Sequence, residues 1–180
     1  MNIDNDEHLT DLKNAILRAF PDVVFEGKIT RHDGAWLPEL TEENAIHDDD
    51  MFLYEALKGH KWSDIPRQFL YDMAGAFVLL TSEALIAFMG AWLMCSLENL
   101  TGQNDVREYF IYTFGRKNEA QIKDFTISLL RAFNPEQLAV LCLLLAEFSK
   151  SESSNFVREH AHNAVKLIES LNLTEKKGTA

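Results

Sequence analysis

Histidine and carboxylate side chains gather in the first third of the chain, where they could hold a divalent metal ion. The members are His32, Asp33, His47, Asp48, Asp49, Asp50 and Glu55. Imidazole nitrogens and carboxylate oxygens are common ligands of such ions. The spacing matches no standard metal-binding loop, however, and three consecutive aspartates point in different directions on a helix. We therefore expect no metal here, and helix capping or a solvated surface explains these residues. A small enzyme or ligand-binding domain with this polar pocket is the alternative.

The motifs of nucleophilic and cofactor-dependent enzymes do not occur in the sequence. There is no Gly-x-Ser-x-Gly turn to expose a serine, no phosphate-binding P-loop and no Gly-x-Gly-x-x-Gly. His160 and His162 stand two residues apart, which separates them by about 200° around a helix and prevents both from binding one ion. We predict no catalytic residue and no cofactor, and thus a protein that is not an enzyme.

The cysteines and the apolar stretches of the sequence indicate where in the cell the protein is expected. Cys95 and Cys142 lie in strongly apolar sequence, which favours two buried free thiols over a disulfide. Residues 1–7 are acidic and lack the apolar core of a signal peptide. The apolar stretches at 84–97 and 138–148 are shorter than the roughly 20 residues that a membrane span needs. We expect a cytoplasmic protein with no membrane association.

The negative charge of the chain is concentrated near its start. The net charge is −11, and residues 1–60 hold 14 Asp and Glu against five Lys and Arg, whereas the other 120 residues hold 14 against 12. A one-sided acidic surface attracts cationic partners and repels nucleic acid. The candidate partner-binding acids are Glu42, Glu43, Asp48, Asp49, Asp50 and Glu55. Trp36 and Trp62 flank this segment and are either core residues or exposed anchors, since tryptophan is enriched in binding hot spots.

One short stretch combines basic and aromatic side chains. Arg107 precedes the aromatic residues of 109–114, and Arg116, Lys117 and Lys123 follow them. Such a mixture can bind single-stranded nucleic acid. The acidic net charge opposes that function, and aromatic residues at this spacing are typical of a helix core. We expect no nucleic-acid partner.

Apolar residues recur every three or four positions along most of the chain, which predicts an all-α fold. We expect one helical domain over residues 1–173, with about seven or eight helices and a disordered tail at 174–180. The helices at 81–97 and 135–148 are apolar on most sides and should form the centre. The only candidate β segment runs from Val23 to Thr30.

Helix start and stop signals divide the chain. Ser63, with a proline three residues later, predicts a helix whose apolar face continues to Val78. Gly59 is a natural cap for the helix that precedes it. Asn134-Pro135-Glu136-Gln137 is the clearest start signal, because it places a cap, a first-turn proline and a capping-box glutamine in order.

Three stretches carry a resemblance to a known family. Residues 62–66 read Trp-Ser-Asp-Ile-Pro, residues 77–84 read Phe-Val-Leu-Leu-Thr-Ser-Glu-Ala, and residues 134–138 read Asn-Pro-Glu-Gln-Leu. They resemble a family of small uncharacterised bacterial helical proteins, in which Trp-x-x-Ile-Pro precedes a Phe-Leu-Thr-Pro-Glu-Ala motif and a long apolar helix. Ser82 stands where that family has proline. The resemblance implies a bacterial, cytosolic helical protein and assigns no functional residue.

Together these patterns favour an acidic protein that binds a basic partner. The most concrete form is a cytosolic immunity protein that neutralises a basic toxin. A homodimeric structural or regulatory adaptor, built on apolar helix faces, is a further alternative.

Overall fold

The computed structural model describes residues 3–30, 48–98, 100, 103–115, 120–151 and 154–177. Within these residues the chain is one all-α domain of eight α-helices and two short 3₁₀ helices, without a strand, as the sequence predicted. The elements are α1 (Ile3–Ala19), α2 (Asp48–Leu57), η2 (Trp62–Asp64), α3 (Arg67–Asp72), η3 (Ala76–Leu79), α4 (Ser82–Ser96), α5 (Asp105–Gly115), α6 (Ala120–Ala132), α7 (Pro135–Ser151) and α8 (Asn155–Lys177).

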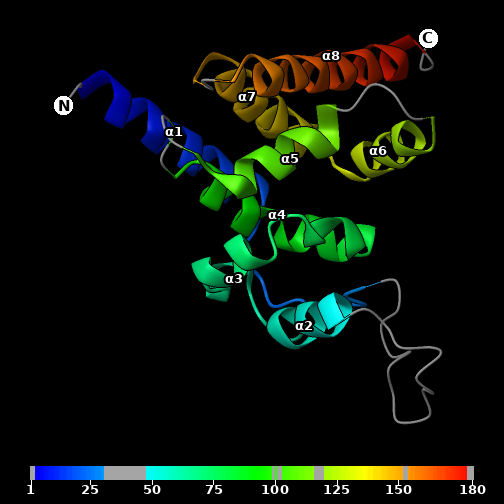
Figure 1. Ribbon diagram of the computed structural model, residues 1–180. Coiled ribbons are helices and arrows are strands. Elements are labelled where there is room, and N and C mark those ends of the chain that lie inside the picture. Colours follow the sequence, from blue (N-terminus) through cyan, green and yellow to red (C-terminus); the bar gives the residue numbers. More distant parts are fainter. Residues whose placement is uncertain are drawn as a thin grey trace.

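Helix α4 is the centre of the domain, as its apolar sequence predicted. It contacts α1, α3, α5, α6 and η2 (Figure 1), and ten of its 15 residues are buried. Burying apolar surface on nearly every side of one helix supplies most of the driving force for packing the others around it. The helix begins where Thr81 caps it, because the Thr81 hydroxyl accepts a hydrogen bond of 3.2 Å from the backbone N–H of Ala84.

Helix α7, the second predicted central helix, packs between α8 and α1. Its start confirms the predicted capping box. The Asn134 side chain accepts from the Gln137 backbone N–H at 2.9 Å, and the Gln137 side chain accepts from the Asn134 backbone N–H at 3.0 Å. The Gln137 amide also donates to the carbonyl of Ala19 at 3.2 Å, and so caps the end of α1.

Helix α5 is more central than its sequence pattern indicated, because it packs on α3, α4 and α8. Arg107, which the sequence placed in a basic and aromatic patch, is fully buried and therefore unavailable to nucleic acid. Its guanidinium donates to the carbonyls of Ser96 and Glu98, both at 3.3 Å, and lies 5.8 Å from the centre of the Phe148 ring. A positive charge at the carboxyl end of α4 is favoured by the helix dipole. Of the other basic residues of that patch, Arg116 and Lys117 lie outside the described residues.

The helix predicted from Ser63 to Val78 is broken into η2, α3 and η3, so that prediction was wrong in its continuity. Pro66 has an extended backbone (ψ 137°) and precedes α3, which ends after six residues. The indole ring of Trp62 lies against Gly90 of α4. A Cβ atom at Gly90 would be only 2.7 Å from this ring, so the close contact requires glycine. Packing of the indole therefore fixes η2 and overrides the helical pattern that the sequence shows.

The candidate β segment is extended but forms only an isolated bridge, between Thr30 and Leu80. The Thr81 hydroxyl donates to the carbonyl of Lys28 at 2.6 Å, and its backbone N–H donates to the carbonyl of Ile29 at 2.9 Å. These bonds hold the segment against the start of α4.

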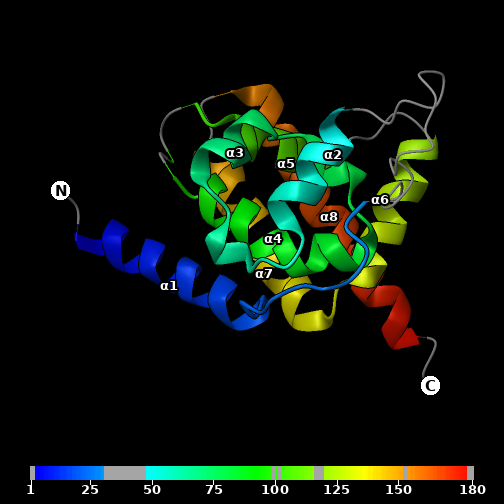
Figure 2. The same ribbon diagram turned by 90° about the horizontal axis from the view of Figure 1, so that it is seen from below.

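Helices α2 and α3 lie on the same side of α4, and α7 and α8 lie on the opposite side (Figures 1 and 2). Helix α8 continues to Lys177, through the first four residues of the expected tail at 174–180. Among the described residues, no helix has both the length and the apolar composition that crossing a bilayer requires.

Candidate functional site

The outer face of α2 combines exposed apolar and acidic side chains. Phe52 is 51% exposed and Met51 is 38% exposed, and Glu55, one helical turn further on, is exposed as well. Residues three and four positions apart are neighbours on a helix surface. Leu53 and Leu57, on the opposite face, are fully buried and attach α2 to the core. The helix therefore presents an aromatic ring, a thioether and a carboxylate together to solvent.

The end of α2 is held by a glycine turn. Gly59 has a φ of 71°, the left-handed conformation that a helix-ending glycine adopts, as predicted. Its N–H donates to the carbonyl of Phe25 at 3.2 Å, and the Phe25 N–H donates to the carbonyl of His60 at 3.2 Å. The Lys58 ammonium donates to the carbonyls of Glu26 and Gly27, at 3.0 and 2.9 Å. These contacts fix the direction of α2 and with it the direction of its outer face.

The predicted partner-binding acids lie on and before α2. The backbones of Asp48, Asp49 and Asp50 form its first turn, where carboxylates are favoured by the helix dipole. Glu42, Glu43 and Trp36 lie outside the described residues. Phe52 and Met51 were missed by the sequence reasoning. The signal that could have found them is their spacing, three and four residues before Glu55, opposite the leucines of the same helix.

Trp62 is a core residue and not an exposed anchor, which corrects the second of its two interpretations. Its side chain is 5% exposed, packs on Gly90, and donates its indole N–H to the carbonyl of Phe20 at 3.0 Å. A ring that is buried and hydrogen-bonded in this way cannot reach a partner without unfolding η2.

The described part of the chain does not support a metal site. It contains no group of three or more His, Cys, Asp or Glu side chains that could together bind a metal ion. His32, Asp33 and His47 lie outside the described residues. The polar pocket built on them stays a prediction.

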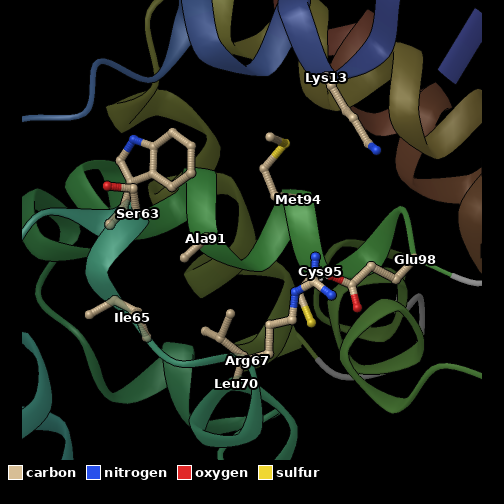
Figure 3. A pocket seen from close by; sticks show the side chains of 10 residues that line it. Lys13, Ser63, Ile65, Arg67, Leu70, Ala91, Met94, Cys95 and Glu98 are labelled. Carbon is tan, nitrogen blue, oxygen red and sulfur yellow. Dashed lines mark ion pairs between the residues drawn. The ribbon is translucent and has the colours of Figure 1, made fainter. Parts of the chain in front are cut away.

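A cleft of about 250 Å³ opens between α1, η2, α3 and α4 (Figure 3). Lys13, Arg67 and Glu98 are the charged residues that line it, and the Arg67 Nε atom lies 2.9 Å from Glu98 Oε1. Cys95 lies among them, and burial, with the negative charge of Glu98, raises the pKa of its thiol to about 11. Because the thiolate is the nucleophile, this raised pKa makes Cys95 a weaker nucleophile at neutral pH than an ordinary cysteine.

Both cysteines are free thiols, as predicted. Cys142, on α7, is only partly buried, however, and this differs from the prediction of two buried thiols. Burial, followed by the charge of Glu169, raises the pKa of the Cys142 thiol. Neither cysteine has the depressed pKa of a catalytic thiol.

Comparison of the chain with protein-family models, with curated proteins and with solved structures gave no match. The resemblance to the bacterial family therefore stays a prediction, and the function has to be inferred from the surface of the molecule.

Proposed function

We propose that this chain is a non-enzymatic acidic binding protein that uses the outer face of α2 to bind a basic protein partner. In its most concrete form it is a bacterial, cytoplasmic immunity protein that neutralises a basic toxin. The observation that carries the proposal is the side-by-side exposure of Phe52 and Met51 with Glu55, in the helix that begins with Asp48, Asp49 and Asp50.

The two kinds of side chain on α2 have different roles in binding. Phenylalanine and methionine are enriched at the buried centres of protein interfaces, because they exchange a large apolar area with the partner. Burying a half-exposed Phe52 contributes about 1–2 kcal/mol at 25 cal/mol per Å². The carboxylates attract a cationic partner over about 10 Å at 0.1 M salt and accelerate its association. The apolar residues then govern mainly the dissociation rate and the acids mainly the association rate, so both contribute to affinity.

The charge distribution supports a basic partner over an anionic one. The first 60 residues carry a net charge of −9, and nearly all of the net charge of the chain is found there. Glu55 on α2 is exposed, and so is Glu26, whose carbonyl accepts from Lys58 at the end of that helix. A partner with a cationic surface, such as a nuclease active site, gains Coulomb energy on approach, whereas an anionic surface is repelled.

Affinity capture from a bacterial lysate tests the proposal. The wild-type chain is compared with a variant in which Asp48, Asp49 and Asp50 are replaced by Lys. The matched control replaces Glu7, Asp11 and Glu169, which are exposed on α1 and α8, with Lys.

We expect one basic protein to be retained by the wild type and by the control and to be lost by the α2 variant. The same proteins on all three would mean that the acids of α2 only aid solubility. Retention of a second copy of the chain instead would favour the homodimer.

A further inference from the structure

A second acidic surface lies next to α2. A groove of about 540 Å³ runs between the end of α3, η3 and the first turns of α5, and its size is within the range of binding pockets. It is lined by Tyr71, Asp72, Met73, Ala74, Gly75, Ala76, Val78, Leu79, Asp105 and Tyr109. Helix η3, which forms one wall of the groove, also packs against α2. Figure 2 shows α2 and α3 on the same face of the molecule.

The charged residues that line the groove are both carboxylates. Asp72 accepts a hydrogen bond of 2.8 Å from the Gln68 amide, and Asp105 accepts one of 3.2 Å from the Gln103 amide. Neutral amides orient these carboxylates without cancelling their charge. Asp72 is the last residue of α3, so its carboxylate lies near the negative end of that helix and gains nothing from the helix dipole. Asp105 begins α5, where the helix dipole favours a carboxylate. Since both charged side chains that line the groove are acidic, a cation is attracted to it and an anion is repelled.

Two tyrosines line the groove, and the side chain of one of them, Tyr71, is hydrogen-bonded to Cys95 of the neighbouring cleft. Tyr109 is 52% exposed and Tyr71 is 37% exposed. Tyr109 packs on Gly75, where a side-chain carbon would lie 3.0 Å from the ring atom Cδ1. The absence of a side chain at Gly75 lets the ring rest on the backbone and leaves about half of the tyrosine side chain open to solvent. An exposed tyrosine face beside carboxylates attracts cations through its quadrupole.

We infer that this groove binds the guanidinium group of an arginine side chain on the basic partner, an inference that rests on the proposed function. A guanidinium is planar, so it stacks on an aromatic ring while its N–H groups donate to carboxylates at the ring edge. Asp72 and Asp105 supply the acceptors from two different elements, and Tyr109 supplies the ring. An anion would meet two like charges, and an apolar group would remove water from the carboxylates without neutralising their charge.

The test uses the intact chain with ¹³C-labelled tyrosine rings and a capped Gly-Arg-Gly peptide as the probe. The same peptide with citrulline, which keeps the shape of arginine but has no charge, is the matched control. We expect the arginine peptide to shift the ring signals of Tyr71 and Tyr109 and to leave those of Tyr54 and Tyr112 in place. The citrulline peptide should shift none of the four at the same concentration. Equal shifts with both peptides, or shifts at Tyr54 and Tyr112 alone, would overturn the inference.

Conservative variants locate the site. Asp72→Asn with Asp105→Asn keeps the side-chain shapes and should weaken binding of the arginine peptide about fivefold. Glu7→Gln with Asp11→Asn removes the same charge from α1 and should change it less than about twofold. Equal weakening by both pairs would indicate a general charge effect and contradict a site in the groove.

This experiment separates the groove from the proposed function. If lysine substitutions in α2 abolish partner capture and the arginine peptide does not shift Tyr109, the groove is wrong and the proposed function stands. If the lysine substitutions in α2 do not change partner capture while the arginine peptide still shifts the Tyr109 signals, the groove binds cations but the proposed function is wrong.

Discussion

The close approach of α5 and α8 gives a sharp prediction about the stability of the fold. Gly115 is the last residue of α5, and a side-chain carbon there would collide with the backbone oxygen of His160 in α8 and lie 2.6 Å from its carbonyl carbon. Ordinary contacts are 3.4 Å or more. The obstacle is the backbone of a helix, so Gly115→Ala must displace α8 by about 1 Å. A gap of that size removes a quarter to a half of the van der Waals energy of the contacts between the two helices there.

The magnitude follows from two opposing effects. Overpacking of this kind costs about 1–3 kcal/mol, and the better helix propensity of alanine returns less than about 1 kcal/mol. We expect Gly115→Ala to lower the free energy of unfolding by about 2 kcal/mol, which lowers Tm by roughly 4–8 °C in a chain of this size. Urea unfolding followed by circular dichroism at 222 nm measures the change.

Gly75→Ala is the matched control for this substitution. A side-chain carbon at Gly75 would lie 3.0 Å from the Tyr109 ring, which is half exposed and can rotate away. We expect a change below about 0.5 kcal/mol there. Equal stability of Gly115→Ala and the wild type would refute the packing of α5 against α8 that the structure shows.

Further predictions follow from single residues. Gly59→Ala should cost about 1 kcal/mol in urea unfolding, because φ is 71° at this position, and Gly59→Asn should cost less. Arg107→Met should cost about 3 kcal/mol in the same assay, because it leaves the carbonyls of Ser96 and Glu98 without their charged donor; a cost below about 1 kcal/mol would show that this cap is dispensable. Iodoacetamide at pH 8 should modify Cys142 before Cys95, as followed by peptide mass spectrometry. The pKa of the Cys95 thiol is about 11 in the folded chain, against an ordinary value of 9.0. Between pH 9 and 11 this thiol therefore ionises in the unfolded chain but not in the folded one. We expect the free energy of unfolding to fall as the pH rises through this range.

Local signals in the sequence predicted the elements that are governed by neighbouring residues. Thr81 and the pair Asn134 and Gln137 start helices as their types require, because a cap is a contact between residues three positions apart. The buried helix α4 was predictable because almost every position in it is apolar. Gly59 was predictable because a left-handed turn favours glycine.

Long-range contacts determined what the sequence pattern missed. Trp62 is buried because Gly90, 28 residues later, leaves room for its ring. Arg107 is buried because the end of α4 offers carbonyls that its guanidinium can pair with. Neither partner is adjacent in sequence, so no window of neighbouring residues indicates the contact.

The candidate site was predicted in part. Acidic composition indicated the α2 segment, but the exposure of Phe52 depends on which face of α2 packs on the core, and Leu53 and Leu57 decide that. The groove beside η3 joins residues of α3 and α5 that are more than 30 positions apart, so the sequence alone did not indicate it.

The most direct test of the proposed function is the binding kinetics of the captured basic partner at about 50 and about 200 mM salt. Exposed charges are screened more strongly at the higher of these salt concentrations. The wild-type chain is compared with Phe52→Ala and with the variant in which Asp48, Asp49 and Asp50 are lysine. We expect the acids to govern association, so that the lysine variant associates about tenfold more slowly at low salt and loses the salt dependence. We expect Phe52→Ala to raise the dissociation rate about tenfold without changing association. Rates that are the same for all three chains would contradict a binding role for the outer face of α2.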